Sequence, residues 1–165
     1  AEEAARLLGA AERPMIVAGS GALDAGAEVL AIAEALAAPV MSFRMGRGVI
    51  GAHALDVRLP VGHRLWAEAD VVLLVGTRGQ NALGAWGTAG LKVIRVDIDP
   101  EEMTRFNRPD VALHDDAAPI LAAIAARIGR HNRARPGWFD AIAATKAAVM
   151  AKVEATLPQQ VGFLK

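Results

Sequence analysis

The chain of 165 residues has no cysteine, no tyrosine and no net formal charge, and only 4% of its residues are aromatic. Without cysteine it can form no disulfide, no thiolate metal site and no cysteine nucleophile. Its 18 basic and 18 acidic residues leave no excess positive charge, so neither nucleic acid nor a membrane surface is an expected partner. No apolar run approaches the roughly 20 residues that cross a bilayer. We therefore expect a cytoplasmic protein.

Hydrophobic residues make up 53% of the chain, enough for the core of one domain. Short apolar runs alternate with segments of helical periodicity, the pattern of a parallel sheet with helices on both faces. We predict strands at 15–18, 40–43, 71–75, 92–97 and 111–113. We predict helices at 2–11, 24–37, 63–69, 117–128 and 138–156. The expected fold class is α/β, with three α/β/α layers around a Rossmann-like parallel sheet of about six strands.

The polar stretch Gly129–Gly137 indicates a boundary near residue 130. Residues 1–130 would then form one domain, and residues 131–165 a linker helix that Pro158 stops, followed by the start of a further domain. The chain opens in a helical pattern without an initiator methionine. We therefore expect a piece of a longer polypeptide, whose other domains are its partners.

Polar and glycine-rich motifs follow three of the predicted strands. In open parallel sheets, ligands bind at the carboxyl ends of the strands. Glycine there lets a phosphate approach the backbone, and a helix N-terminus offers it free N–H groups. Asp97 could accept a hydrogen bond from a ribose hydroxyl, and Arg78 could pair with a phosphate oxygen. We predict a nucleotide-type cleft lined by Gly19, Ser20, Gly21, Gly76, Thr77, Arg78, Asp97 and Asp99.

Each of these features also has a purely structural explanation. Turns between strands and helices need glycine for geometry alone. Asp99 and Glu102 have the spacing of a helix capping box, and Arg78 could lie over the edge of the sheet. The dinucleotide fingerprint is also incomplete, because Asp24 replaces its third glycine and the second strand ends near Arg44 instead of an acid. An NAD site of the usual kind is therefore disfavoured.

No catalytic or metal-binding set is visible. The histidines are scattered, without metal-ligand spacing or a Ser/His/Asp arrangement: His53, His63, His114 and His131. We expect His53 and His63 to be surface or loop residues, and Trp66 and Trp138 to be packing residues of helices. The sequence thus predicts no catalytic residue and no metal site.

Five motifs follow one another in a recognisable order. They are RPMIVAGSGA at 13–22, LAAPV at 36–40, GRGVIGAH at 46–53, ADVVLLVGTR at 69–78 and KVIRVDIDPE at 92–101. Over residues 2–128 this series resembles the central domain of thiamine-diphosphate (ThDP)-dependent enzymes of the acetolactate synthase-like superfamily. Each motif is weak alone, and the series is what makes the resemblance specific.

The resemblance implies a parent enzyme with a pyrimidine-binding domain, this central domain and a pyrophosphate-binding domain. Such an enzyme uses ThDP and magnesium to act on 2-oxo acids, as a carboligase, a decarboxylase or an oxalyl-CoA-type lyase. It would be a homo-oligomer, a dimer or a tetramer. The other domains would bind ThDP and magnesium, so we expect this chain to be non-catalytic by itself.

Central domains of this family bind FAD in acetolactate synthase and ADP in oxalyl-CoA decarboxylase, and in many members nothing known. FAD-binding relatives continue the Gly-Thr-Arg turn with phenylalanine, two acids and another arginine. This chain continues it with Gly79-Gln80-Asn81-Ala82, which disfavours FAD. Two alternatives remain, an FAD- or ADP-binding regulatory module and a free-standing NAD-binding protein. The absence of zinc-binding cysteines weakens the second.

Overall fold

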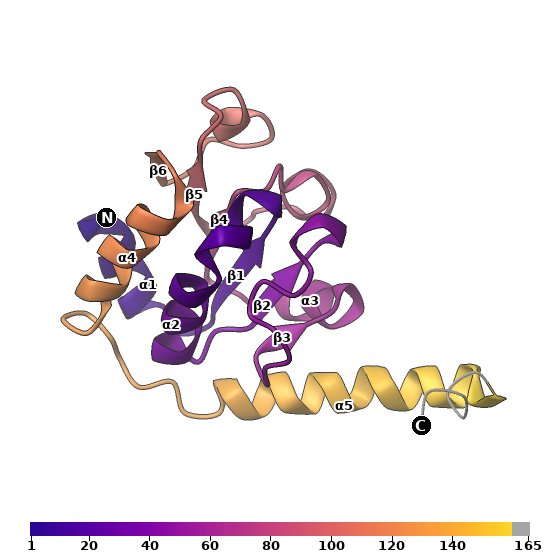
Figure 1. The fold of residues 1–165 in the computed structure, drawn as a ribbon. Coiled ribbons are helices and arrows are strands. Elements are labelled where there is room, and N and C mark those ends of the chain that lie inside the picture. The colour runs from indigo at the N-terminus through magenta and orange to yellow at the C-terminus, as the bar shows by residue number, and fades with distance from the viewer. Residues whose placement is uncertain (160–165) are drawn as a thin grey trace.

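The computed structural model describes residues 1–159, which form a six-stranded sheet with helices on both faces (Figure 1). The strand order is β3-β2-β1-β4-β5-β6, and every neighbouring pair is parallel. The order reverses between β1 and β4, which is the topological switch point of a doubly wound sheet. The predicted fold class is therefore confirmed.

The strands are β1 (Pro14–Ala18), β2 (Val40–Ser42), β3 (Asp56–Val57), β4 (Val71–Val75), β5 (Lys92–Asp97) and β6 (Val111–His114). The α-helices are α1 (Glu2–Ala10), α2 (Gly26–Leu36), α3 (Leu59–Trp66), α4 (Ala117–Ile128) and α5 (Trp138–Thr156). Three 3₁₀ turns are η1 (Ser20–Ala25), η2 (Arg44–Gly46) and η4 (Glu102–Thr104), and η3 (Gln80–Trp86) is a π-helix.

The core lies on both faces of the central strands. Every residue of β1 and β4 is buried, as their uninterrupted apolar sequences predict for strands covered on both sides. Helices α1, α2 and α4 pack together on one face, while α3 packs on the other beside β2 and η3 (Figure 1). No helix of residues 1–159 is long and apolar enough to cross a membrane.

The structure corrects several local predictions. The stretch expected to be irregular contains β3, an edge strand too short to show any periodicity. Helix α3 begins at Leu59 instead of 63, because Pro60 suits a first helical turn. The helix expected at 24–37 begins at Gly26, after the 3₁₀ turn η1. The polar loop after β4 contains the π-helix η3.

The polar stretch before α5 is not a free linker, because it packs on α1. Arg135 donates hydrogen bonds to the carbonyl oxygens of Leu8, Gly9 and Ala11, at the C-terminal end of α1. The Trp138 Nε1–H then donates to Pro14 O at 3.2 Å. The first half of α5 is thereby held to the body of the domain. The division near residue 130 stays a prediction.

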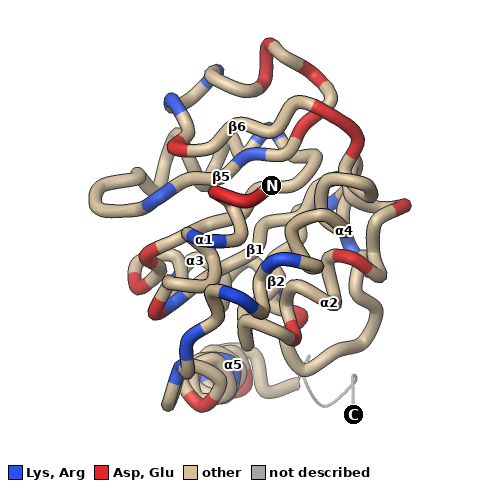
Figure 2. The backbone as a smooth tube through the Cα atoms, turned by 90° about the vertical axis from the view of Figure 1, so that its left-hand side faces the viewer, with Lys and Arg blue, Asp and Glu red and all other residues tan. Residues whose placement is uncertain are grey.

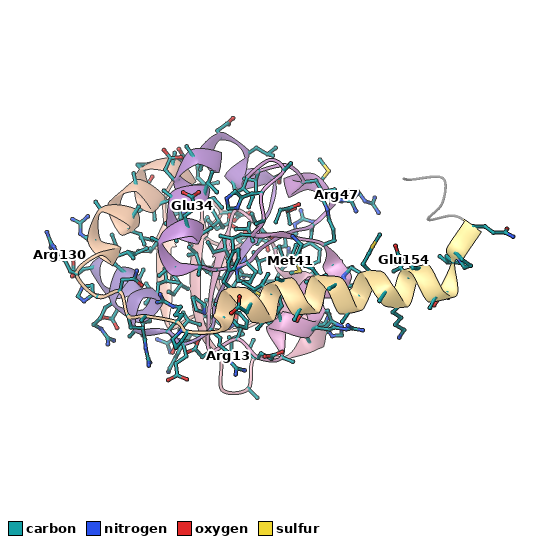
Figure 3. The ribbon with its side chains drawn as sticks, turned by 90° about the horizontal axis from the view of Figure 1, so that it is seen from below. Arg13, Glu34, Met41, Arg47, Arg130 and Glu154 are labelled. Atoms are coloured by element: carbon teal, nitrogen blue, oxygen red, sulfur yellow. The ribbon has the colours of Figure 1, made fainter. Side chains whose placement is uncertain are left out.

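The second half of α5 projects away from the sheet (Figures 1 and 3). Met150 and Val153 on this half and Leu157 just after it have exposed fractions of 47%, 37% and 46%. The predicted start of a further domain falls mostly on residues 160–165, which lie outside the described residues.

Candidate functional site

A pocket of roughly 830 Å³ opens at the carboxyl edge of the sheet. Segments that follow β1, β2, β4, β5 and β6 line it, so it sits at the switch point where doubly wound sheets bind ligands. The structure places every residue of the predicted cleft in its wall: Gly19, Ser20, Gly21, Gly76, Thr77, Arg78, Asp97 and Asp99. That these residues bind a ligand stays a prediction.

The glycines of this wall pack backbone against backbone where β1 and β4 end. A Cβ atom on Gly19 would lie 2.2 Å from Gly76 O, and one on Gly76 would lie 2.4 Å from Gly21 C. Gly76 also has φ +52°, in the left-handed region that favours glycine. Contact between the two loops is therefore enough to require glycine at positions 19, 21 and 76.

The first loop already uses most of its backbone donors. Gly19 N donates to Val75 O at 3.0 Å, Gly21 N to Gly76 O at 3.1 Å and Ala22 N to Gly19 O at 3.2 Å. The segment that follows is the 3₁₀ turn η1 instead of the expected α-helix N-terminus. A diphosphate at this loop would have to compete with the protein's own carbonyls for the N–H groups.

Thr77 and Arg78 have different surroundings. Thr77 Oγ1 accepts from Gly79 N at 3.3 Å, and Thr77 O accepts from Nη2 of Arg95 at 2.8 Å. The Arg78 side chain is 75% exposed, and its Nε lies 3.6 Å from Oε1 of Glu102. The hydrogen bonds of Thr77 therefore serve the structure of the loop. Arg78 is an exposed cation that already faces a carboxylate.

The two aspartates after β5 shape their own turn. Asp97 Oδ1 accepts from Asp99 N at 3.1 Å, and Asp99 Oδ1 accepts from Glu101 N at 2.9 Å. The expected capping box is wrong, because only the short turn η4 follows and the Glu102 side chain turns to arginines instead of back to Asp99. Asp99 is thus a turn residue that happens to line the pocket.

Glu102, a buried residue of the pocket wall, is the centre of a cluster of charged side chains. Its Oε1 accepts from Nη1 of Arg105 and faces Arg78. Arg95 is 1% exposed; burial lowers the pKa of its guanidinium, while the charges of Asp97 and Glu102 oppose that shift. Sequence reasoning missed this cluster. A charged residue inside the apolar run of β5 was the signal that could have revealed it.

Acidic groups outnumber basic ones around the pocket. Its wall contains the guanidinium groups of Arg44 and Arg78 against six carboxylates, from Asp24, Asp97, Asp99, Glu102, Asp115 and Asp116. Figure 2 shows acidic positions along the loop above β5 and β6 and at the turn into α4. The local field therefore disfavours an anionic ligand.

Aromatic residues gather beside the pocket, around Trp86 of the π-helix. Its ring centroid lies 6.3 Å from that of Phe43 in the pocket wall, 4.7 Å from His63 and 5.6 Å from Trp66. Trp66 is buried, as is Trp138, so both are packing residues. His63 lies exposed on α3 and His53 lies in a loop, as expected. The sequence did not predict that Trp86 would be the centre of these ring contacts.

No group of three or more His, Asp or Glu side chains within residues 1–159 is placed to hold a metal ion. The carboxylates of Asp97 and Glu102 in the pocket wall face arginine side chains. The described residues therefore do not fit a magnesium–diphosphate group, which needs several oxygen ligands around the metal.

Fold and pocket together define a doubly wound α/β domain with a ligand-type cleft at its switch point. Residues 1–124 match the family described as "Thiamine pyrophosphate enzyme, central domain". The chain belongs to this family, as its series of motifs indicates.

Several curated relatives bear names of whole enzymes. The chain is 38% identical over 138 residues to a protein named "Probable 2-ketoarginine decarboxylase" from Pseudomonas aeruginosa, covering 79% of this chain and 24% of the relative. It is 32% identical over 146 residues to "Pyruvate oxidase" from Lactiplantibacillus plantarum, covering 83% and 24%. It is 30% identical over 154 residues to "Probable acetolactate synthase large subunit" from Methanocaldococcus jannaschii, covering 86% and 26%. The chain spans about a quarter of the length of these relatives.

Proposed function

We propose that this chain is the central, non-catalytic domain of a larger ThDP- and magnesium-dependent enzyme that acts on 2-oxo acids as a carboligase or decarboxylase. Membership of the central-domain family carries the proposal. Two of the relatives' names contain a 2-oxo acid, 2-ketoarginine and pyruvate, which supports this substrate class.

ThDP would supply the carbanion chemistry of the parent enzyme, and its metal would be held by residues outside this chain. The role of the present residues is then to pack. Several exposed apolar side chains are suited to contact with neighbouring domains. They are Met45 and Ile98 at the pocket, Leu23 on η1, and Met150 and Leu157 at the projecting end of α5.

The test compares the 165-residue chain with the complete polypeptide of its gene. Each is assayed for pyruvate and 2-ketoarginine decarboxylation, and for acetolactate formation, with ThDP and Mg²⁺. We expect turnover of a 2-oxo acid by the complete polypeptide and none by the chain alone. Turnover by the chain alone, or a complete polypeptide that neither binds ThDP nor uses any 2-oxo acid, would contradict the proposal.

The pocket supports a second candidate, weak nucleotide binding in a structural or regulatory role. Its volume suits a nucleotide, and Asp97 lies where a ribose hydroxyl could donate to it. Against tight binding stand the occupied amides of the first loop and the pairing of Arg78 with Glu102. Each missing charged contact lowers affinity by about tenfold or more.

Calorimetry of the chain with FAD, ADP and NAD tests this candidate. We expect no FAD to copurify and ADP to bind weakly at best, with further weakening in Arg78→Ala and Asp97→Ala. Tight FAD binding, or ADP binding that neither substitution changes, would place the nucleotide elsewhere.

A further inference from the structure

The carboxylates of the pocket wall come from three segments of the chain and are mostly unpaired. They lie in the segments that end or follow β1, β5 and β6: Asp24, Asp97, Asp99, Glu102, Asp115 and Asp116. Of this set, only Asp97 and Glu102 form an ion pair among residues 1–159. The pocket therefore carries more negative charge than the described residues neutralise.

A second observation at the same wall points to a missing hydrogen-bond donor. Glu102 is 8% exposed, and its Oε2 atom is buried without a partner among residues 1–159. Arg105 hydrogen bonds to the other oxygen, Oε1, and so satisfies only half of the carboxylate. Buried acceptors without a donor are rare, because no hydrogen bond offsets the loss of their hydration. Glu102 can therefore accept from a further N–H donor.

Arg78 is held only weakly at this carboxylate. Its Nε lies 3.6 Å from Oε1 of Glu102, too far for a hydrogen bond, and its side chain is 75% exposed. An exposed ion pair of this kind contributes little, so the arginine can turn into solvent at small cost. Arg78 therefore faces Glu102 as a cation that an external ammonium or guanidinium group can replace.

The spacing of the acids favours an organic cation over a metal ion. No three His, Asp or Glu side chains of residues 1–159 are placed to hold a metal ion. The strand order β1-β4-β5-β6 separates the first acidic segment from the last by three strand spacings, roughly 14 Å. Acceptors spread along such an edge suit a chain molecule that carries N–H cations at several points.

We propose that this pocket binds an extended organic cation of the polyamine class, with one of its ammonium groups at Glu102 in place of Arg78. Its other ammonium groups lie at the aspartates that follow β5 and β6. The ligand supplies the donor that Oε2 of Glu102 lacks, and its charge neutralises the acids that have no ion pair. This inference goes beyond the proposed function and does not depend on it, because it involves no catalytic step.

Calorimetry of the 165-residue chain with spermidine, at low ionic strength, tests the proposal. Triethylene glycol is a neutral chain of similar length and serves as the matched probe, while Mg²⁺ serves as the metal-ion probe. We expect spermidine to bind, triethylene glycol not to bind, and Mg²⁺ to bind more weakly than spermidine. Absence of spermidine binding, or Mg²⁺ binding of equal strength, would overturn the proposal.

Substitutions at Glu102 and Arg78 should change spermidine affinity in opposite directions. Glu102→Gln should weaken binding by about tenfold, whereas Glu101→Gln, at an exposed residue outside the pocket, should leave it unchanged. Arg78→Ala should strengthen binding by about twofold to fivefold, because it removes the competing guanidinium. The same variant should weaken ADP binding, so its sign separates this proposal from the nucleotide candidate. Equal affinities for the two glutamine variants, or weaker spermidine binding by Arg78→Ala, would contradict the proposal.

A second pair of variants keeps the test decisive if Glu102→Gln does not fold. Asp116 and Asp140 are exposed aspartates at the starts of α4 and α5, and only Asp116 lines the pocket. Asparagine preserves their shape and removes the same charge from each. Asp116→Asn should weaken spermidine binding by about twofold to fivefold, and Asp140→Asn should not change it. Equal weakening by both would reduce the attraction to net charge and would overturn the assignment of the site.

Discussion

The two edges of the sheet use their polar side chains differently. At the amino edge, Arg135 donates five hydrogen bonds, and Asp70 accepts the backbone N–H groups of Glu12 and Arg13. Three buried side-chain atoms toward the carboxyl edge find no partner in residues 1–159: Ser42 Oγ, Arg95 Nη1 and Glu102 Oε2. One edge thus holds the chain together, while the other combines unmatched groups with open volume.

The difference separates polar residues that serve the fold from those that could serve a ligand. A side chain bonded to the chain's own backbone, like that of Arg135, contributes to stability and to little else. A buried donor without a partner lowers stability, and such groups often mark functional sites. Substitutions at the two edges should therefore change different properties.

The largest expected effect is at the carboxyl edge, where the two glycine loops meet. Gly76→Ala should lower the free energy of unfolding by about 3 kcal/mol or more, because it combines a left-handed φ with a Cβ–backbone overlap. The matched control is Gly129→Ala, at φ −55° with no atom within 4 Å of the added Cβ. It should change stability by at most about 1 kcal/mol. Urea unfolding measures both, and similar losses would contradict the packing explanation.

At the amino edge, Arg135→Met should lower the free energy of unfolding by about 2–3 kcal/mol. The substitution keeps a long side chain but removes the donors to the last carbonyls of α1. Arg133→Met serves as the control, since Arg133 is half exposed and pairs only with the exposed Glu12, a contact worth under about 1 kcal/mol. Neither variant should change ligand binding; altered ADP affinity in Arg135→Met would break the division between the edges.

A smaller effect concerns pH. Burial acts to raise the pKa of Asp110, but hydrogen bonds from Lys92 Nζ and Val93 N, both at 2.8 Å, outweigh it and hold the pKa below its usual value. A carboxyl group with a lowered folded-state pKa stabilises the fold above its unfolded-state pKa, and this contribution is lost as pH falls through the folded value.

The unsubstituted chain should therefore lose this stability between about pH 5 and pH 3, and Asp110→Asn should lose less over the same range. The difference should stay under about 1 kcal/mol, because Lys92 and part of Asp110 are in contact with solvent. Urea unfolding of both proteins across this range measures it, and an Asp110→Asn curve parallel to that of the unsubstituted chain would argue against the contribution.

Strong local patterns made most of the fold predictable. The apolar runs of β1, β4 and β5 and the helical period of α4 specify their own structures, and α5 is rich in alanine and contains neither glycine nor proline. Strand β3 could not be predicted, because two residues at a sheet edge depend on pairing with β2 alone. The π-helix η3 likewise lacks a local pattern that would distinguish it from a loop.

The position of the candidate site was predictable, but its chemistry was not. Parallel strands bring their carboxyl ends together, so the motifs after β1, β4 and β5 had to meet. The partners of Glu102 come from segments up to 24 residues away in the sequence, since Arg78 is among them. Only the folded arrangement reveals that this carboxylate neutralises the arginine on which a phosphate contact would depend.

The central claim is that ligands bind at the carboxyl edge of the sheet and not at the amino edge. The most direct test is to record ¹⁵N–¹H correlation spectra of the chain during a titration with ADP. Such spectra detect weak binding at individual backbone amides. We expect any shifts to be confined to the loops after β1, β4 and β5, at residues 19–22, 76–81 and 97–105. Shifts at the amino edge instead, around the small pocket at residues 133–138, would contradict the assignment of the site.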